Sequence, residues 1–339
     1  MSEESKIGYI LMNIGTPSEP TTKGVRTFLR EFLSDPDVID INPILRWGIV
    51  NLIVAPFRPR TVLPQYQSIW TDEGSPLLAN SEKFKNSLNE FDSDLNVEIG
   101  MRYGKPSISD AADKLIASGV EKIVLCPMFP QFAQATTGSC NAKGIEILKE
   151  KEIDYSTINN FYSEDFYIDA VVNQVKKSNA FDTGEHLLFS FHGLPERQLK
   201  KTDPSGGFCL VDSECCEKTS EFNQLCYKFH CTETVKKIMS KLNTDKPYTI
   251  CFQSRFGRDK WISPDILSVL QNFADDGVKN VTVICPSFIA DCLETLEEIS
   301  IRDLEIFQEM GGEKLELVPA LNSEPDWVEG FAGFLRKNS

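Results

Sequence analysis

The sequence LLFSFHGLPER, residues 187–197, is a short apolar run that stops at a histidine and then breaks into Gly-Leu-Pro. A mainly apolar run of this length, bounded by turn residues, is typical of a strand buried on both faces of a parallel sheet. The last side chain of such a strand lies at the carboxyl edge of the sheet, where open α/β folds bind their ligands. His192 is therefore the first candidate for a functional residue, although a lone histidine at a strand end is more often a satisfied core residue.

Similar apolar runs recur along the chain and alternate with segments of helical periodicity. Strands are predicted near residues 7–14, 97–103, 123–127, 158, 187–191, 248–253, 281–285 and 315–319. Alternating strands and helices of these lengths predict an α/β protein with parallel sheets. Among the helices, one is expected to start at Ser263-Pro264, a cap followed by proline at the first helical position, and one is expected over residues 291–310.

One pair of segments indicates an internal repeat, although chance similarity between two strands stays open. GVEKIVLCPMF, residues 119–129, resembles GVKNVTVICPSF, residues 277–288, including the turn, the strand and the Cys-Pro exit. We therefore expect two similar α/β domains with parallel sheets facing a central cleft, the commonest kind of place for a ligand. The expected boundaries are residues 1–180 and 181–322, with a last helix in residues 323–339 packing on the first domain.

Charge and composition limit the classes of function. The chain has 339 residues and a formal net charge of −15, which argues against nucleic-acid binding and makes attraction of a cation plausible. No secretion leader is visible and no apolar run approaches the ~20 residues of a spanning helix, so we expect a cytoplasmic protein. The stretch Pro43–Trp70 mixes apolar residues with Arg46, Arg58 and Arg60. It is either an amphipathic helix packed on the core or an apolar lip whose arginines bind anionic groups.

An acidic cluster follows the strand at residues 281–285. On a regular helix Asp291, Glu294 and Glu298 would share one face, where their mutual repulsion needs solvent or a cation to offset it. A solvated face is the ordinary explanation. However, this face starts at the carboxyl end of a strand, as His192 does, and that common location favours one joint site.

The cysteines form a second cluster. Five of the ten fall within residues 209–231, whereas Cys126, Cys251 and Cys285 lie in or beside apolar strands as small hydrophobic residues. In a chain without a leader, a local group of this kind predicts a metal or iron–sulfur site sooner than disulfides.

Several longer motifs resemble the ferrochelatase family, and the resemblance extends over nearly the whole chain. The motifs are MNIGTP (12–17), QYQSIW (65–70), GSP (74–76), HGLP (192–195), FQSRFG (252–257) and PSFIADCLETLEEI (286–299). The resemblance implies insertion of Fe²⁺ into protoporphyrin IX, the last step of haem synthesis, between two Rossmann-like domains. Two pyrrole N–H protons must leave as the cation enters, so the site needs a proton acceptor and carboxylates.

By resemblance, His192 and Glu294 are the catalytic pair, and whether the histidine accepts protons or ligates iron stays open. Asp291 and Glu298 would extend the acidic track for iron or protons. The resemblance further implies walls that hold the macrocycle bent. The implied substrate-binding residues are Ile14, Arg60 (or Arg58, for a propionate), Tyr66, Arg102, Tyr103, Phe132 and Trp261, with phenylalanine at 132 where many relatives have tyrosine.

The segment after Arg197 departs from the simplest members of the family. Some relatives carry a 2Fe–2S cluster on four cysteines, commonly in a C-terminal extension that this sequence does not show. The internal group therefore resembles an alternative ligand set, formed by four of Cys209, Cys215, Cys216, Cys226 and Cys231. Zinc or no metal are the alternatives. For the whole protein, the rivals are a chelatase for coproporphyrin and a non-catalytic porphyrin or iron–sulfur sensor, and peripheral contact with a membrane is a further expectation.

Overall fold

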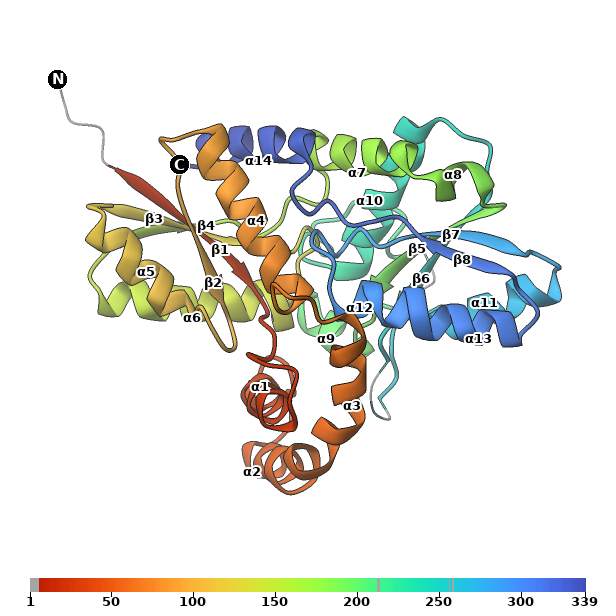
Figure 1. The fold of residues 1–339 in the computed structure, drawn as a ribbon, viewed down its shortest axis with the longest axis horizontal. Helices are drawn as coiled ribbons and strands as arrows, with labels where there is room; N and C mark the ends of the chain where they lie inside the picture. Colours follow the sequence, from red (N-terminus) through yellow and green to blue (C-terminus); the bar gives the residue numbers. More distant parts are fainter. Residues whose placement is uncertain (1–5, 212–213, 256, 258) are drawn as a thin grey trace. The chain divides into compact units, whose positions relative to one another are not determined.

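The computed structural model describes residues 6–211, 214–255, 257 and 259–339, and contacts between residues divide the chain into two units (Figure 1). The first unit comprises the described residues up to Phe129, with Gln134–Asn160 and Asn322–Ser339. The second comprises Pro130–Ala133 and Phe161–Leu321. Residues 161–180, expected in the first half, make their contacts within the second unit.

The first unit contains a parallel sheet of four strands in the order β2-β1-β3-β4. The strands are β1 (Ile7–Asn13), β2 (Asn96–Met101), β3 (Lys122–Pro127) and β4 (Asp154–Thr157). Helices α5 (Ile108–Ala117) and α6 (Ser139–Glu150) pack on this sheet around Ile10 and Leu125. Helix α4 (Pro76–Phe91) packs on β2, and Trp327 of α14 (Pro325–Lys337) stacks on Phe84 of α4 with ring centroids 5.4 Å apart.

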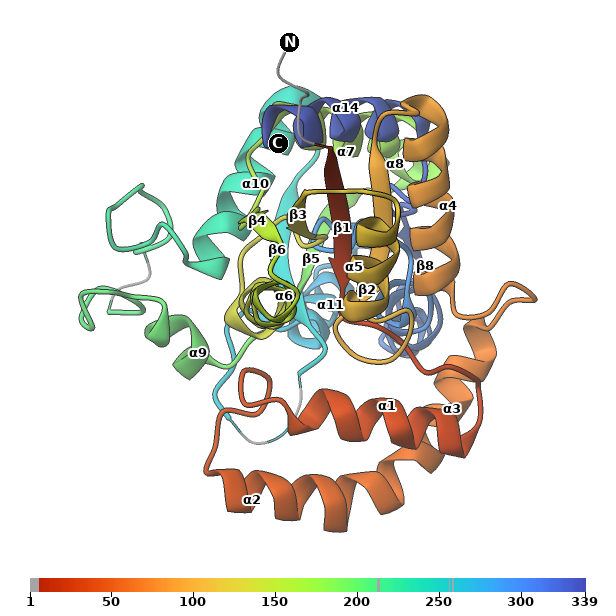
Figure 2. The same cartoon turned by 90° about the vertical axis from the view of Figure 1, so that its left-hand side faces the viewer.

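The remaining helices of this unit form a separate layer below the sheet in Figure 2. They are α1 (Thr22–Ser34), α2 (Pro43–Gly48), the π-helical turn η1 (Ile49–Val54) and α3 (Ala55–Ile69), and a second π-helical turn η2 (Gln134–Gly138) precedes α6. The stretch from Pro43 to Ile69 is thus helical throughout. It buries Val50 and Val54, but it leaves a set of large apolar side chains exposed, namely Ile44, Leu45, Trp47, Leu52, Ile53 and Phe57. We call this exposed set the apolar lip.

The second unit repeats the plan with a parallel sheet in the order β6-β5-β7-β8. Its strands are β5 (His186–His192), β6 (Tyr248–Gln253), β7 (Asn280–Ile284) and β8 (Lys314–Leu317). The two segments with similar sequences form β3 and β7, which hold the same place in the two sheets. Residues 187–191 of β5 are all buried, as expected for a strand between two neighbours in a covered sheet. The prediction of an α/β fold with two parallel sheets is confirmed.

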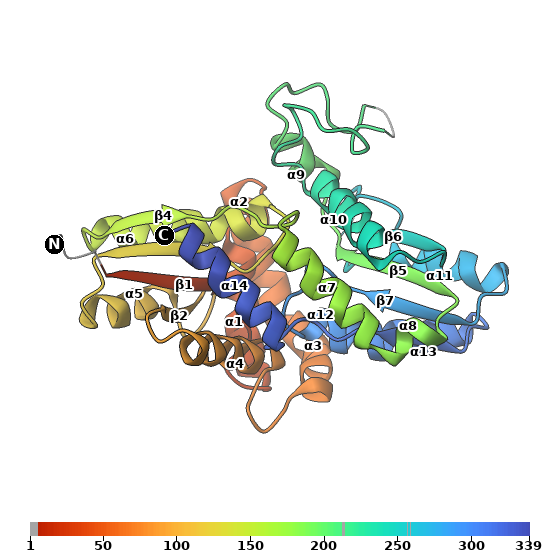
Figure 3. The same cartoon turned by 90° about the horizontal axis from the view of Figure 1, so that it is seen from above.

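Helices complete the second unit. They are α7 (Asp165–Lys177), α8 (Asn179–Thr183), α9 (Glu196–Lys201), α10 (Tyr227–Leu242), α11 (Ile266–Asp275), α12 (Leu293–Leu296), the π-helical turn η3 (Glu298–Asp303) and α13 (Leu304–Glu309). Figure 3 shows that the described residues of the long segment between α9 and α10, 202–211 and 214–226, which hold most of the clustered cysteines, form no helix or strand.

Two helix predictions are wrong in detail. Helix α11 starts at Ile266 instead of Pro264, because the Asp265 side chain accepts a hydrogen bond from the Ser268 amide (3.1 Å) and caps the helix. The single regular helix expected over residues 291–310 is three pieces, α12, η3 and α13, and Asp291 lies before the first of them.

Candidate active site

His192 is the last residue of β5 and pairs with Gln253 at the end of β6. Its ring Nδ1 lies 2.7 Å from the Gly193 carbonyl oxygen. Because a carbonyl can only accept, Nδ1 carries the proton and Nε2 keeps its lone pair. The Tyr227 hydroxyl donates to the backbone carbonyl of His192 (2.9 Å), so both the ring and the main chain of this residue are held.

Gly193 brings Trp261 close to this histidine. A Cβ atom at position 193 would lie 3.0 Å from a ring carbon of Trp261 and 2.9 Å from the Gln253 carbonyl oxygen. Glycine is therefore needed at position 193 for the Trp261 indole to pack against the backbone there. The indole Nε1 is buried and finds no hydrogen-bond partner among the residues that the structure describes. The structure thus places the predicted wall residue Trp261 beside Gly193, the neighbour of His192.

Gln253 links the end of β5 to the acidic segment, a role that the sequence did not indicate. The Ser190 hydroxyl donates to Gln253 Oε1 (2.6 Å), and this bond fixes the orientation of the amide. The amide Nε2 then donates to the backbone carbonyl of Glu294 (2.7 Å). This chain of bonds ties the start of α12 to the strand that ends at His192. It uses the main chain of Glu294, whose half-buried carboxylate accepts from the Cys292 thiol.

The other predicted acidic residues, Asp291 and Glu298, are each hydrogen-bonded to a different part of the second unit. Asp291 Oδ1 accepts from the Thr295 hydroxyl (3.0 Å) and from the Ala320 amide (3.3 Å). Glu298 accepts from both the amide and the hydroxyl of Ser254, at 2.8 and 2.6 Å. The three carboxylates are therefore not on one regular helix, because Asp291 precedes α12, Glu294 lies in α12 and Glu298 opens η3.

Charge around Glu298 is balanced by Arg302, which sequence analysis missed. The Arg302 guanidinium lies 2.6 Å from Glu298 Oε1 and 3.2 Å from Asp303 Oδ1. Asp303 is 0% exposed, and within the described part of the chain its Oδ2 has no hydrogen-bond partner. Burial raises the pKa of Asp303 to about 7, although the neighbouring arginine acts against this shift. Near pH 7 the Asp303 side chain is thus present in both its neutral and its ionised form.

In the first unit, Arg102 and Tyr103 converge on Asp35. Arg102 and the Tyr103 hydroxyl donate to Asp35 Oδ2 at 2.5 and 2.7 Å. Ser139 also donates to this oxygen, at 2.7 Å. Burial opposes ionisation of Asp35, but these hydrogen bonds and the arginine together hold its pKa below the ordinary value. Asp35 and Ser139 were not predicted, because the Asp35-Pro36 pair is equally well explained as the end of a helix.

The other predicted residues of this unit lie just after β1 and on α3. Ile14 follows β1 and is half-buried, and its carbonyl accepts from the Tyr103 amide (3.0 Å). Gly15 is required beside it, since a Cβ there would lie 1.9 Å from the Tyr103 carbonyl oxygen. Tyr66 is buried in α3, while Arg58 and Arg60 on the same helix are exposed. No helix in the described part of the chain is long and apolar enough to cross a membrane.

Phe132 lies in the second unit and is 7% exposed. Its backbone amide donates to Nδ1 of His230 (3.1 Å). His230 was not predicted, because nothing in the sequence distinguishes it from a core residue of α10.

Four of the five clustered cysteines lie close together in the second unit. Cys209 and Cys216 donate hydrogen bonds to the Cys226 sulfur, and these bonds lower the pKa of Cys226 to about 3. The Cys215 and Cys216 sulfurs are 3.7 Å apart. Cys209, Cys215 and Cys226 also line one small pocket. We call Cys209, Cys215, Cys216 and Cys226 the four-cysteine group.

Cys231 lies outside this group, on the following turn of α10, where it is wholly buried. Over residues 6–211, 214–255, 257 and 259–339, no set of three or more His, Cys, Asp or Glu side chains is arranged to hold a metal ion. The thiols are instead hydrogen-bonded to one another.

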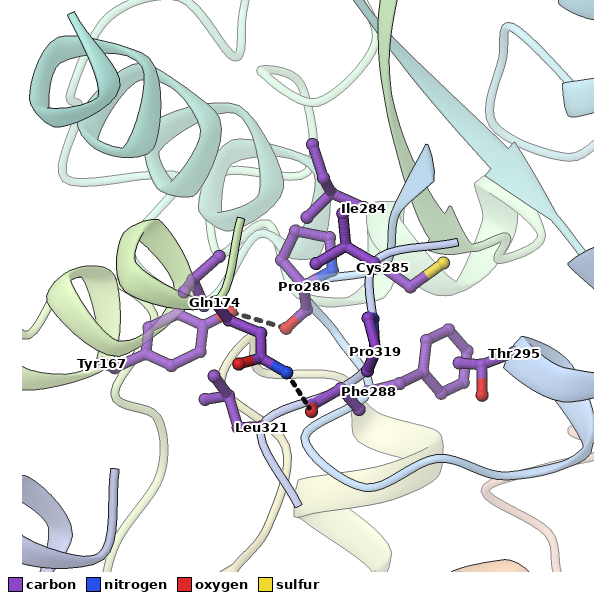
Figure 4. Close-up of a pocket in the computed structure, with 12 residues that line it drawn as sticks. Tyr167, Gln174, Ile284, Cys285, Pro286, Phe288, Thr295, Pro319 and Leu321 are labelled. Carbon is purple, nitrogen blue, oxygen red and sulfur yellow. Dashed lines mark hydrogen bonds between the residues drawn. The ribbon is translucent and has the colours of Figure 1, made fainter. Parts of the chain in front are cut away.

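A further pocket of the second unit lies between α7 and the ends of β7 and β8 (Figure 4). Its walls are mainly apolar, and two of its polar side chains, Gln174 and Tyr167, form hydrogen bonds with backbone carbonyls. Gln174 donates to the Ala320 carbonyl (3.3 Å) and Tyr167 to the Pro286 carbonyl (2.5 Å). None of the predicted site residues lines it, so it is not a candidate active site.

Comparison with known proteins agrees with the motifs. The sequence model of the family described as Ferrochelatase matches residues 6–339. A ferrochelatase of Coxiella burnetii (strain CbuG_Q212) is 42% identical over 100% of this chain and 95% of its own length. A ferrochelatase of Pseudomonas fluorescens (strain SBW25) is 40% identical, with 95% of each chain covered. Among solved structures, SirB from Bacillus subtilis with Fe³⁺ has a TM-score of 0.52 at 12% identity, covering 76% of this chain and 88% of that one. This last similarity concerns the fold alone.

Proposed function

The chain belongs to the ferrochelatase family and inserts Fe²⁺ into a porphyrin in haem synthesis, and on this premise we propose that its porphyrin is protoporphyrin IX. The observation that carries the proposal is the apolar lip of the first unit, in a chain with a net charge of −15. Protoporphyrin IX has fewer carboxylates and more apolar edge than coproporphyrin III. An acidic protein with exposed apolar side chains favours the less charged of the two.

We propose that His192 and Glu294 perform the chemistry. The hydrogen bond to the Gly193 carbonyl keeps the ring proton on Nδ1. His192 Nε2 therefore has a lone pair that can accept a pyrrole proton or contact the iron. Glu294 supplies the negative charge that favours the entering cation and can take the second proton. Glu298 and Asp291 are already hydrogen-bonded, so their proposed part is to shape the acidic segment.

Residues of both units are proposed to bind the porphyrin. Trp261 and Phe132 would supply wall contacts in the second unit, and Ile14 and Tyr66 in the first. Arg60, which is exposed, is the proposed partner of a propionate. Arg102 is held by Asp35, so we propose that it acts with Tyr103 as a fixed polar pair.

The test is anaerobic incubation of the purified protein with Fe²⁺ and either protoporphyrin IX or coproporphyrin III. Loss of free porphyrin and the absorption of the product give the two rates. Faster haem formation from protoporphyrin IX is expected. A preference for coproporphyrin III would reverse the substrate assignment. Tight porphyrin binding without turnover on either substrate would favour the rival function, a non-catalytic sensor.

We further propose that the four-cysteine group binds a 2Fe–2S cluster. The chemistry of the donor set fits, because three of the four cysteines line one small pocket and the fourth, Cys216, has its sulfur 3.7 Å from that of Cys215. Loading would require the thiol side chains to turn away from one another, since they are now hydrogen-bonded. A bound cluster would supply a redox-sensitive link between the segment after α9 and the start of α10.

Absorption spectroscopy tests the ligand set. Anaerobically purified protein should show charge-transfer bands in the visible range, and Cys216→Ala should abolish them. Cys231→Ala is the matched control, because Cys231 is buried outside the group, and its bands should persist. A colourless protein that contains zinc would replace iron–sulfur by zinc in this proposal, and loss of the bands in Cys231→Ala would overturn the choice of four.

We also propose that the protein works in the cytoplasm and contacts the membrane surface through its apolar lip. The support is the number of large apolar side chains that α2, η1 and α3 expose together.

A further inference from the structure

The first turn of α10 contacts three functional parts of the second unit. Cys226, at the N-cap position of α10, belongs to the four-cysteine group. The next residue, Tyr227, donates its hydroxyl hydrogen to the backbone carbonyl of His192 (2.9 Å). His230, one turn further along, accepts from the backbone amide of Phe132 (3.1 Å). One short piece of helix thus joins the cysteines to the proposed catalytic histidine and to a proposed porphyrin wall.

His230 is held firmly enough to transmit a displacement. It is 0% exposed, and its ring stacks on Tyr162 with centroids 3.8 Å apart and planes 9° apart. Nδ1 must be the acceptor because the Phe132 amide can only donate. Nε2 must carry the proton because its partner, the Gln224 carbonyl (2.9 Å), can only accept. Both ring nitrogens are therefore used, and the ring has one tautomer and one orientation.

The two partners of His230 lie at opposite ends of the proposed connection. Gln224 is in the cysteine-bearing segment between Cys216 and Cys226, and Phe132 is in the short segment Pro130–Ala133. A second bond joins the same elements, since Gln131 Nε2 donates to the Thr234 hydroxyl of α10 (3.1 Å). A shift of the cysteine segment moves the Gln224 carbonyl and Cys226, and through them the ring that holds Phe132.

We propose that Tyr227 and His230 are positioning residues that couple the state of the four-cysteine group to the placement of His192 and Phe132. Turning the thiols from one another toward a bound metal centre moves Cys226, and the first turn of α10 moves with it. Tyr227 acts on the proton-accepting residue, so it affects the rate of insertion. His230 acts on the wall, so it affects porphyrin binding. The coupling rests on the proposed roles of His192 and Phe132 in metal insertion.

Side-chain substitutions separate the two positioning roles. Tyr227→Phe removes only the hydroxyl, and we expect kcat to fall about fivefold with the porphyrin KM unchanged. His230→Asn can place its amide oxygen where Nδ1 accepts from Phe132, and its KM should stay within about twofold of the wild-type value. His230→Gln can replace only the Nε2 bond to Gln224, and its porphyrin KM should rise about tenfold. Equal KM values in the two His230 variants would contradict the assignment of His230.

Amide hydrogen exchange tests the coupling to the cysteines without measuring activity. The full-length protein is compared after anaerobic reconstitution with Fe²⁺ and sulfide, and after removal of metal by a chelator under reducing conditions. Exchange in the peptides that contain Phe132 and Gly193 should differ between the two forms. In His230→Gln the difference should vanish for the Phe132 peptide and persist for the Gly193 peptide, whereas Tyr227→Phe should give the reverse.

Three outcomes overturn the coupling. They are identical exchange in the two forms, a difference that survives in both variants, and failure of the cysteines to bind iron and sulfide on reconstitution. The insertion assay on the same samples keeps this failure apart from failure of the proposed function. If the wild-type protein inserts Fe²⁺ but its amide exchange is the same in the reconstituted and metal-free forms, only the coupling is contradicted. If the wild-type protein does not insert Fe²⁺, the proposed roles of His192 and Phe132 are contradicted.

Discussion

His192 and Glu294 are held by main-chain contacts, so their side chains can be changed with little effect on the surrounding fold. Tyr227 bonds to the His192 carbonyl and Gln253 bonds to the Glu294 carbonyl, and neither contact uses the side chain being replaced. We expect His192→Ala and Glu294→Gln each to lower kcat at least about a hundredfold, the usual effect of losing a proton-transfer group. Porphyrin binding, followed by fluorescence quenching, should change less than about threefold. Glu298→Gln is the comparison variant. Turnover retained in His192→Ala or in Glu294→Gln would remove the substituted residue from the mechanism.

The wholly buried Asp303 should make stability depend on pH in an unusual direction. Its pKa is about 7 in the folded protein, against 3.8 for the ordinary group. Between about pH 4 and about pH 7 the folded protein therefore holds a proton that the unfolded chain has lost. Stability falls as the pH rises through this window, and below it or above it this group has no further effect.

Asp303→Asn isolates this effect because the amide oxygen can still accept from Arg302 Nε. The wild-type free energy of unfolding minus that of the variant should fall by a few kcal/mol between about pH 4 and about pH 8. Urea unfolding at several pH values measures the difference, in which the other carboxylates cancel. A difference that is constant with pH, or that grows with pH, would contradict a raised pKa at this residue.

At the scale of elements, strands were more predictable than helices. The strands of the described residues lie within a few residues of their predicted positions. The central strands β1, β3, β5 and β7 were the clearest, because burial between two neighbouring strands leaves a mainly apolar run in the sequence. The α12, η3 and α13 series was predicted as one helix. A π-helical turn has no local sequence signal of its own, since tertiary contacts such as the Glu298 to Ser254 bonds decide it.

The same limit applies to the candidate site. His192, Glu294 and the cysteines were found because their residue types suit the chemistry and their positions follow strands. Gln253 appeared only within the FQSRFG motif (252–257), and Tyr227, His230 and Asp35 were not singled out. Their roles depend on partners 35 to 98 residues distant in the chain. The residue pattern of one segment cannot predict a hydrogen bond to a residue so distant in the chain.

The apolar lip is an element-scale feature whose proposed role can be tested with a matched control. Replacing Leu52 and Phe57 together by glutamine should weaken binding to phosphatidylcholine vesicles at least about tenfold, because each large apolar side chain contributes about 1.5–3 kcal/mol on burial. Cosedimentation measures the binding. Phe91→Gln is the control, since Phe91 is 55% exposed on α4, away from the lip, and this variant should bind as the wild type does. Equal binding by the double variant would rule out the lip as the membrane contact.

At the scale of the whole molecule, the net charge of −15 acts in opposite directions on the two substrates. A negatively charged protein attracts Fe²⁺ and repels the propionates of the porphyrin before either substrate touches a specific residue. Added salt screens both effects, because the Debye length falls from about 30 Å at 0.01 M ionic strength to about 8 Å at 0.15 M. The charge should therefore appear in the kinetics of encounter and not in the chemical step.

We expect kcat/KM for Fe²⁺ to fall several-fold between these ionic strengths, while kcat/KM for the porphyrin rises and kcat at saturation of both substrates stays constant. Initial rates with each substrate varied in turn, under anaerobic conditions and with potassium chloride as the salt, give the three quantities. The opposite signs are the control, because general inhibition by salt would lower both ratios together. A parallel fall in the two ratios would show that the charge of the whole chain does not steer its substrates, and that local groups such as Glu294 and Arg60 determine their capture.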